Sequence, residues 1–202
     1  EGALIVFVVL MLFLGNVRAS VIVASVIPMA MLFGFILMRI FGVSANLMSL
    51  GAIDFGIVVD GSIVIIEGIL AHIYTKRLAG KHLTEDEMNA EVEAGAAKVV
   101  KSSAFAVLII LIVFFPILTL GGIEGKYFTP MAKTLVFCII GALILSLTYV
   151  PMMASLFLKR GIDLKPTFAD RFFGWLTGIY NKVLAASMRR LTLTIVSAFA
   201  LL

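Results

Sequence analysis

Four long apolar stretches constrain this chain more than any other feature. They cover residues 19–38, 46–70, 102–123 and 134–158, and a helix needs about 20 apolar residues to cross the hydrocarbon core of a bilayer. Hydrophobic residues make up 62% of the chain, whereas soluble domains contain about 45–50%. The sequence therefore predicts an all-α fold, a polytopic membrane helix bundle with four full transmembrane helices.

Shorter apolar stretches at residues 2–16 and 191–202 predict two partial spans. Because the chain begins and ends inside such stretches, we expect it to be a segment of a longer polypeptide. The predicted organisation has transmembrane helices in residues 1–158, with a cytoplasmic helical loop at 71–101. A cytoplasmic interfacial helix at 159–190 and the start of a further transmembrane helix at 191–202 follow.

The basic residues predict the orientation in the membrane. Of the 16 Lys and Arg residues, only Arg39, Lys126 and Lys133 fall on one side of the predicted spans. Cytoplasmic loops are enriched in Lys and Arg, so the other side is predicted to be cytoplasmic. The net charge of +4 thus reflects topology and gives no reason to expect nucleic-acid binding. His72 and His82 lie beside a basic cytoplasmic loop and are expected to be solvated.

Two cytoplasmic segments have helical patterns. Thr84 followed by Glu87 fits a capping box, which predicts a helix that begins there and has Lys98 near its end. The second segment repeats apolar residues every three or four positions, which fits either a helix in the membrane interface or one packed on the bundle. These residues are Phe168, Phe172, Trp175, Ile179 and Val183.

Three acids, Asp54, Asp60 and Glu67, lie inside the apolar stretch 46–70. A charged side chain near the bilayer centre costs about 2.5–3.5 kcal/mol on insertion scales. The acids must therefore be protonated, paired or directed into a bundle. Asp60 is predicted near the bilayer centre, with Asp54 toward the periplasm and Glu67 toward the cytoplasm.

The spacing of the acids favours separate proton-binding positions. At about 100° of rotation per residue, Asp60 and Glu67 lie within about 20° of one another around the helix axis. Asp54 is turned by about 120° from Asp60. Asp60 and Glu67 are about 10 Å apart along the axis and cannot share one metal ion, whose oxygen ligands lie within about 2.0–2.6 Å. No metal site is therefore assigned.

The predicted spans contain no Lys or Arg, so a cationic partner for the acids must come from outside this chain. Small residues in the same helix would let another helix approach closely. The glycines predicted to serve this close packing are Gly51, Gly56 and Gly61.

The stretch "NLMSLGAIDFGIVVDGSIVIIEG" resembles the fourth transmembrane helix of the resistance–nodulation–division transporters, in their heavy-metal efflux branch. The family pattern is DFG, three residues, DG and then a glutamate, usually within V-E-N. This chain has Asp54-Phe55-Gly56, Asp60-Gly61 and Glu67, but Ile66 and Gly68 flank the glutamate. The resemblance extends over the whole chain and is typical of the N-terminal membrane half of such a pump.

The resemblance implies a trimeric pump of the bacterial inner membrane that couples proton entry to the export of metal cations. Asp60 would be the central proton-binding carboxylate, paired with an intramembrane lysine of the C-terminal half. Asp54 and Glu67 match acids of the divalent branch (zinc, cobalt and cadmium). Val58 stands where the copper and silver branch carries methionine, so divalent ions are favoured. A periplasmic adaptor and an outer-membrane channel are the implied partners.

Other activities are less well supported. The stretch "GGIEGKYF" lacks the residues of a phosphate-binding loop, and the chain contains no Ser–His–Asp set. A secondary transporter without a cofactor is therefore favoured over an enzyme. Two alternatives stay open: a passive cation channel lined by the same acids, and a non-transporting membrane scaffold.

Overall fold

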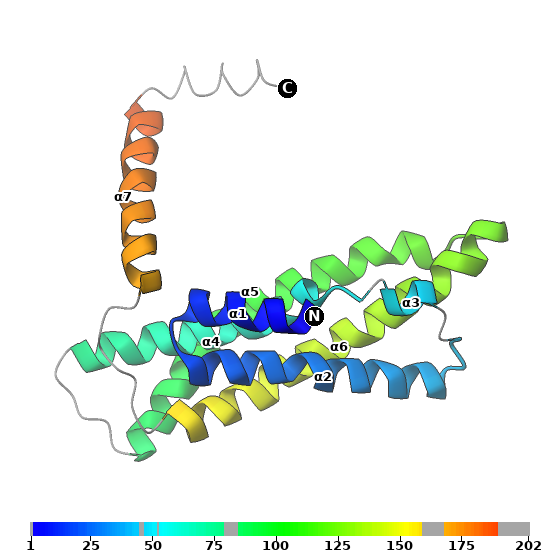
Figure 1. The fold of residues 1–202 in the computed structure, drawn as a ribbon, viewed down its shortest axis with the longest axis horizontal. Coiled ribbons are helices and arrows are strands. Elements are labelled where there is room, and N and C mark those ends of the chain that lie inside the picture. Colours follow the sequence, from blue (N-terminus) through cyan, green and yellow to red (C-terminus); the bar gives the residue numbers. More distant parts are fainter. Residues whose placement is uncertain (1, 45–46, 52, 79–84, 159–167, 190–202) are drawn as a thin grey trace. The chain divides into compact units, whose positions relative to one another are not determined.

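The computed structural model describes every residue except 1, 45–46, 52, 79–84, 159–167 and 190–202. The regular elements of the described chain are helices, labelled in Figure 1. They are α1 (Gly2–Leu14), α2 (Val17–Ile40), α3 (Leu47–Gly51), α4 (Phe55–Leu78), α5 (Glu85–Leu118), α6 (Gly122–Phe157) and α7 (Phe168–Arg189). Four spans are long and apolar enough to cross a membrane. The predicted all-α class is confirmed.

Short polar or glycine-containing turns separate the first helices. After α1, Gly15 adopts φ +60°, a left-handed conformation that glycine enters without steric cost. Asn16 then caps α2, because its side-chain oxygen accepts hydrogen bonds from the backbone N–H groups of Arg18 and Ala19. Gly42, at φ +63°, follows the end of α2 in the same way. These local signals turn the chain back and place α1 beside α2.

Helices α5 and α6 are longer than the sequence predicts. The expected cytoplasmic helix and residues 102–118 of the expected span at 102–123 form one continuous helix, α5, of 34 residues, and the span thus ends earlier than predicted. Helix α6 begins at Gly122, twelve residues before the predicted start at residue 134, and has 36 residues. At 1.5 Å per residue both are about 50 Å long, well beyond a hydrocarbon core of about 30 Å. Thr84, the predicted cap of the cytoplasmic helix, lies outside the described residues.

Small side chains allow α2 and α6 to pack closely. A Cβ atom added to Gly141 would lie 2.6 Å from Cδ1 of Phe33, and one added to Gly34 would lie 3.3 Å from the backbone nitrogen of Cys138. Glycine at such positions lets helix backbones approach in the absence of a hydrophobic driving force within lipid. The α2–α6 pair thus forms one side of the bundle.

Helix α4 lies against α1, α2, α5 and α6, as Figure 1 shows. Its packed face is made of aliphatic side chains that are fully buried, including Ile65, Ile66, Ile69 and Ile73. Tight contacts of such side chains supply the dispersion energy that holds helices together in lipid. The helix that carries the acids is therefore rigidly held on one side.

The second unit, Lys165–Leu202, is described by itself. It contains α7, so the aromatic segment predicted to be helical is helical. Its location at the membrane interface stays a prediction. The start of a further span predicted at residues 191–202 lies outside the described residues.

Candidate functional site

Asp54 lies immediately before α4 and caps it. Its Oδ1 accepts a hydrogen bond from the backbone N–H of Gly56 at 2.9 Å, and its carbonyl oxygen accepts one from Val58 N–H at 3.3 Å. A carboxylate at this position meets otherwise unpaired N–H groups at the positive end of the helix dipole. The segment predicted as one span from residue 46 is thus divided into α3 and α4, with Asp54 at the break between them.

Asp60 and Glu67 lie on one exposed face of α4. The exposed positions recur every three or four residues, as expected for one face of a helix. They are Gly56, Asp60, Val64, Glu67, Ala71 and Thr75. Within the described part of the chain, neither Asp60 nor Glu67 takes part in an ion pair or hydrogen bond through its side chain. The two carboxylates therefore face away from the helices packed on α4.

The opposite face of α4 carries small polar groups as well as isoleucines. A Cβ added to Gly61 would lie 3.4 Å from the hydroxyl oxygens of Ser103 in α5 and Ser146 in α6. The Ser103 hydroxyl also donates to the Gly61 carbonyl at 3.4 Å. Ser62 is fully buried, and its Oγ has no hydrogen-bond partner among the described residues. Helices α4, α5 and α6 therefore meet at Gly61, where an added Cβ would be in ordinary van der Waals contact with the two hydroxyl groups.

The other two glycines predicted to serve close packing are placed differently. Around Gly51, the described structure leaves open space within 4 Å of an added Cβ. An added Cβ on Gly56 would meet only the carboxylate of Asp54, its own cap, at 3.3 Å. Of the three, Gly61 alone has another described helix against it.

Helices α4 and α5 cross most closely at Gly68 and Gly95. A Cβ on Gly68 would lie 2.7 Å from Cγ2 of Val99 and 3.2 Å from the Gly95 carbonyl oxygen. A Cβ on Gly95 would lie 2.9 Å from the Cα of Ile69. Gly68 was noted in the sequence because it replaces the asparagine usual in the family pattern. The structure gives it a physical role, since a larger side chain would collide with α5 as it lies here.

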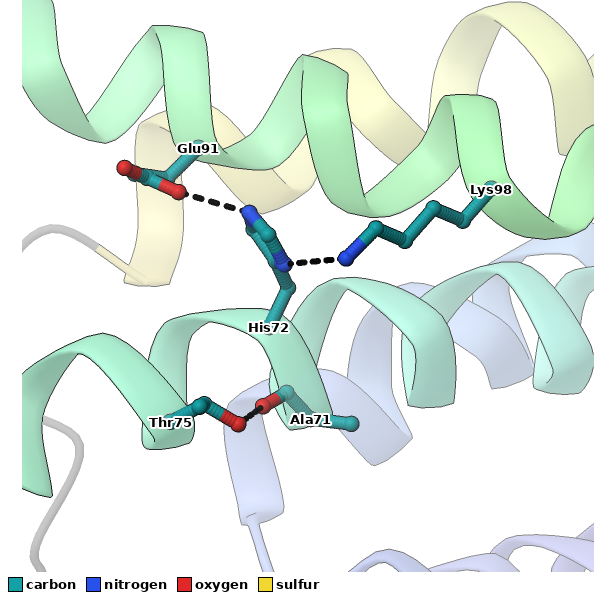
Figure 2. Close-up of polar contacts among 5 residues, drawn as sticks. All are labelled: Ala71, His72, Thr75, Glu91 and Lys98. Carbon is teal, nitrogen blue, oxygen red and sulfur yellow. Dashed lines mark hydrogen bonds and ion pairs between the residues drawn. The ribbon is translucent and has the colours of Figure 1, made fainter.

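A polar cluster beside this crossing was missed by the sequence reasoning. Figure 2 shows His72 between two side chains of α5: its Nε2 lies 2.7 Å from Oε2 of Glu91, and its Nδ1 lies 3.2 Å from Nζ of Lys98. The His72 and Glu91 side chains are only 16% and 18% exposed. The prediction that His72 is simply solvated is therefore wrong. His82 lies outside the described residues.

The physical reason for this error is that the contact is tertiary. Glu91 and Lys98 are seven residues apart, so they share one face of α5, and this spacing was the only signal available in the sequence. Which residue of α4 meets that face depends on where the two helices cross. Among the described residues, no group of three or more His, Cys, Asp or Glu side chains gathers in a way that could hold a metal ion.

Comparison with known proteins identifies the family. A model of the AcrB/AcrD/AcrF family matches residues 1–202. The chain belongs to this family. The predicted membership of the resistance–nodulation–division transporters, with their heavy-metal efflux branch, is thereby confirmed, because the similar proteins described next are named for metal resistance or metal efflux.

This chain is 44% identical over 189 residues to the cobalt-zinc-cadmium resistance protein CzcA of Cupriavidus metallidurans. The match covers 93% of this chain and 18% of CzcA. The chain is 42% identical over 163 residues to the nickel and cobalt resistance protein CnrA of the same organism, covering 80% of this chain and 15% of CnrA. A crystal structure of a heavy metal efflux pump (crystal form I) matches with 41% identity and a TM-score of 0.63, covering 77% of this chain and 14% of the pump. The chain thus spans less than a fifth of the length of these relatives.

Proposed function

We propose that this chain supplies the proton-relay helix of a proton-coupled antiporter that exports heavy-metal cations. The observation that carries the proposal is the asymmetry of α4. One face is packed against the neighbouring helices, and the other presents Asp60 and Glu67 without a described partner. Acids within a membrane span are expensive and usually serve ion or proton pathways.

The exposed face of α4 leaves room for a cationic partner. In the proposed mechanism Asp60 pairs with a lysine of the C-terminal membrane half and releases that lysine when it takes up a proton. Each proton that enters through a potential of 100 mV supplies about 2.3 kcal/mol. Protonation thus changes the relative stability of two helix arrangements, which a transporter needs in order to alternate between its two sides.

Asp54 and Glu67 complete the proposed pathway on either side of Asp60. Asp54 lies at the N-terminal end of α4, and Glu67 lies about 10 Å beyond Asp60 along the helix axis. These intervals are too long for one direct proton transfer, so water has to connect the three positions. The capping contact of Asp54 with Gly56 holds the first carboxylate at the entrance to this row.

Divalent cations are the proposed substrates, with zinc, cobalt and cadmium preferred to copper and silver. The names of CzcA and CnrA refer to cobalt, zinc, cadmium and nickel. The position two residues before Asp60 is Val58, which is 2% exposed on the packed side of α4. A valine offers no thioether for a soft monovalent ion.

The remaining parts of the proposal concern the assembly. The pump is proposed to be a homotrimer in the bacterial inner membrane, working with a periplasmic adaptor and an outer-membrane channel. The four spans long and apolar enough to cross a membrane support a multi-pass protein, and the family supports this type of assembly.

The test is the substitution Asp60→Asn in the full-length pump, expressed in cells that depend on it for zinc resistance. We expect normal amounts in the membrane and resistance reduced to that of cells without the pump, because a side-chain amide, unlike a carboxylate, does not take up and release a proton near neutral pH. Glu93→Gln, which changes an exposed acid of α5, is the matched control and should leave resistance unchanged.

Two results would contradict the proposal. Retained zinc resistance in Asp60→Asn would exclude the relay and favour a scaffold whose acids do not transport. Zinc flux through the reconstituted wild-type pump without a proton gradient, driven only by the zinc gradient, would favour a passive channel.

A further inference from the structure

The His72 ring contacts Glu91 through Nε2 and Lys98 through Nδ1 (Figure 2). A lysine ammonium can only donate hydrogen bonds, so Nδ1 of His72 has to be the acceptor toward Lys98. An ionised carboxylate can only accept, so Nε2 has to carry the hydrogen and donate it to Glu91. These two contacts match the hydrogen-bonding pattern of an imidazole that carries hydrogen on Nε2 and accepts at Nδ1.

The backbone crossing determines where the imidazole lies. Gly95 of α5 is four residues after Glu91 and three before Lys98, so all three share one face. A Cβ added to Gly95 would lie 3.1 Å from Cβ of His72. The close approach of α5 thus places the His72 ring between the acid and the lysine, and a looser crossing would not hold both contacts.

We propose that His72 is a proton-binding site whose occupancy controls the contact between α4 and α5. In the neutral form the ring bridges Glu91 and Lys98 and joins the two helices. A proton added to Nδ1 directs an N–H group at the Lys98 ammonium, so two donors of like charge face one another across 3.2 Å. The Lys98 contact then opens, while the imidazolium keeps its ion pair with Glu91.

The charged residues on the helices around His72 have to be considered next to Glu91 and Lys98. Arg18 of α2 donates from Nη1 to the carbonyl oxygen of Phe157 in α6 at 3.4 Å. Helix α1 contains no charged residue, and the charged residues of α6, Glu124, Lys126 and Lys133, lie in its first twelve residues. On α4, Glu67 is exposed, and the side chains of Lys76 and Arg77 lie outside the described residues. On α5, Glu87, Glu93 and Lys101 are exposed. Lys98 and Glu91 are described groups that contact the His72 ring.

This site is distinct from the row of Asp54, Asp60 and Glu67. The row lies at the capped end and along the exposed face of α4, whereas His72 faces α5. The inference therefore does not depend on the proposed transport function. It adds a second proton-sensitive element, at the opposite end of the same helix from Asp54.

The test is solid-state NMR of the full-length protein in lipid bilayers, labelled with ¹⁵N at histidine and lysine. The His72 signals are assigned by their loss in His72→Gln. At about pH 8, above the ordinary range of an imidazole, we expect a neutral His72 with hydrogen on Nε2 and an acceptor shift at Nδ1. The opposite tautomer, or an imidazolium at this pH, would overturn the proposal.

Two further arms test the coupling to Lys98. Lys98→Met should move the His72 Nδ1 signal, and the control Lys101→Met, at an exposed lysine one turn further along α5, should leave it in place. On acidification of the wild type, the Lys98 Nζ signal should change in the same step in which the His72 imidazolium appears. An unchanged Nδ1 signal in Lys98→Met, or a Lys98 signal that ignores the His72 transition, would refute the coupling. These readouts require no transport, so they stand or fall separately from the Asp60 test.

Discussion

The two faces of α4 differ in what they offer to the rest of the molecule. The face toward α5 and α6 carries buried isoleucines, and its glycines lie close to those helices. The other face carries two carboxylates, Asp60 and Glu67, about two turns apart, and its positions are exposed in the described structure. A helix built in this way is fixed by one side and free to exchange partners on the other. We therefore expect substitutions on the packed face to change stability most, and substitutions on the exposed face to bear on the proposed function.

The largest expected effect on stability is on the packed face. Ile66→Ala removes a fully buried side chain and should lower the free energy of unfolding by about 2–5 kcal/mol, through lost contacts and a residual cavity. Val64→Ala, on the face of the acids where Val64 is 39% exposed, should cost less than about 1 kcal/mol. The measurement is unfolding of the purified protein in mixed micelles. Equal losses would show that the two faces are packed alike.

Gly68→Ala tests the crossing of α4 and α5. The added methyl group would collide with Val99, and we expect a loss of about 1–3 kcal/mol because the packed helices have to move apart. Gly51→Ala is the control, since open space surrounds an added Cβ there within the described structure. The same unfolding measurement applies, and a Gly68→Ala protein as stable as the Gly51→Ala protein would contradict the close crossing.

Asp54 and Asp60 are both acids, but they should differ in their effect on stability. Asp54→Ala removes the cap of α4 and should cost about 1 kcal/mol, whereas Asp54→Asn keeps an oxygen acceptor and should cost less. Asp60→Ala removes an exposed side chain that has no ion pair or hydrogen bond with the described residues, and it should leave stability within about 0.5 kcal/mol. Unfolding midpoints of the three variants check this order. A larger loss of stability in Asp60→Ala than in Asp54→Ala would contradict the role of Asp54 as the stabilising cap of α4.

The smallest effect is expected at Ser62. Its buried hydroxyl lacks a described hydrogen-bond partner, so Ser62→Ala should be neutral or stabilising by up to about 1 kcal/mol. Ser103→Ala, which removes the donor to the Gly61 carbonyl, should be destabilising by about 0.5–1 kcal/mol. A clear loss of stability in Ser62→Ala would reveal a bound water that satisfies the hydroxyl.

Much of the fold could be predicted from the sequence because the bilayer imposes one rule on every span. Apolar stretches of about 20 residues gave the four spans, and helical periodicity placed Asp60 and Glu67 on one face. The ends of helices were predicted less well. No strong breaker separates the polar residues 85–101 from the apolar stretch that follows, and Gly95 is accommodated within the helix, so α5 continues without interruption.

The features that sequence reasoning missed depend on tertiary contacts or on a local hydrogen bond. The division of the acidic span before Phe55 arises because the Asp54 side chain competes for the backbone N–H of Gly56. The contacts of His72 require the position of α5, which no local pattern specifies. Gly68 was noted as a departure from the family pattern, and only the distance to Val99 explains why a glycine suits that position.

The continuity of α5 has a mechanical consequence. Its hydrogen-bonded turns run from Glu85 to Leu118, with Pro116 only near the end, so a change in its tilt would be carried along its whole length. Leu118 lies 23 residues, or about 35 Å, beyond the contact at Gly95. A tilt of about 5° at this contact would move the far end by about 3 Å, roughly the length of one hydrogen bond. A small change of tilt near His72 would therefore move the distant end of α5 by a distance comparable to a hydrogen bond.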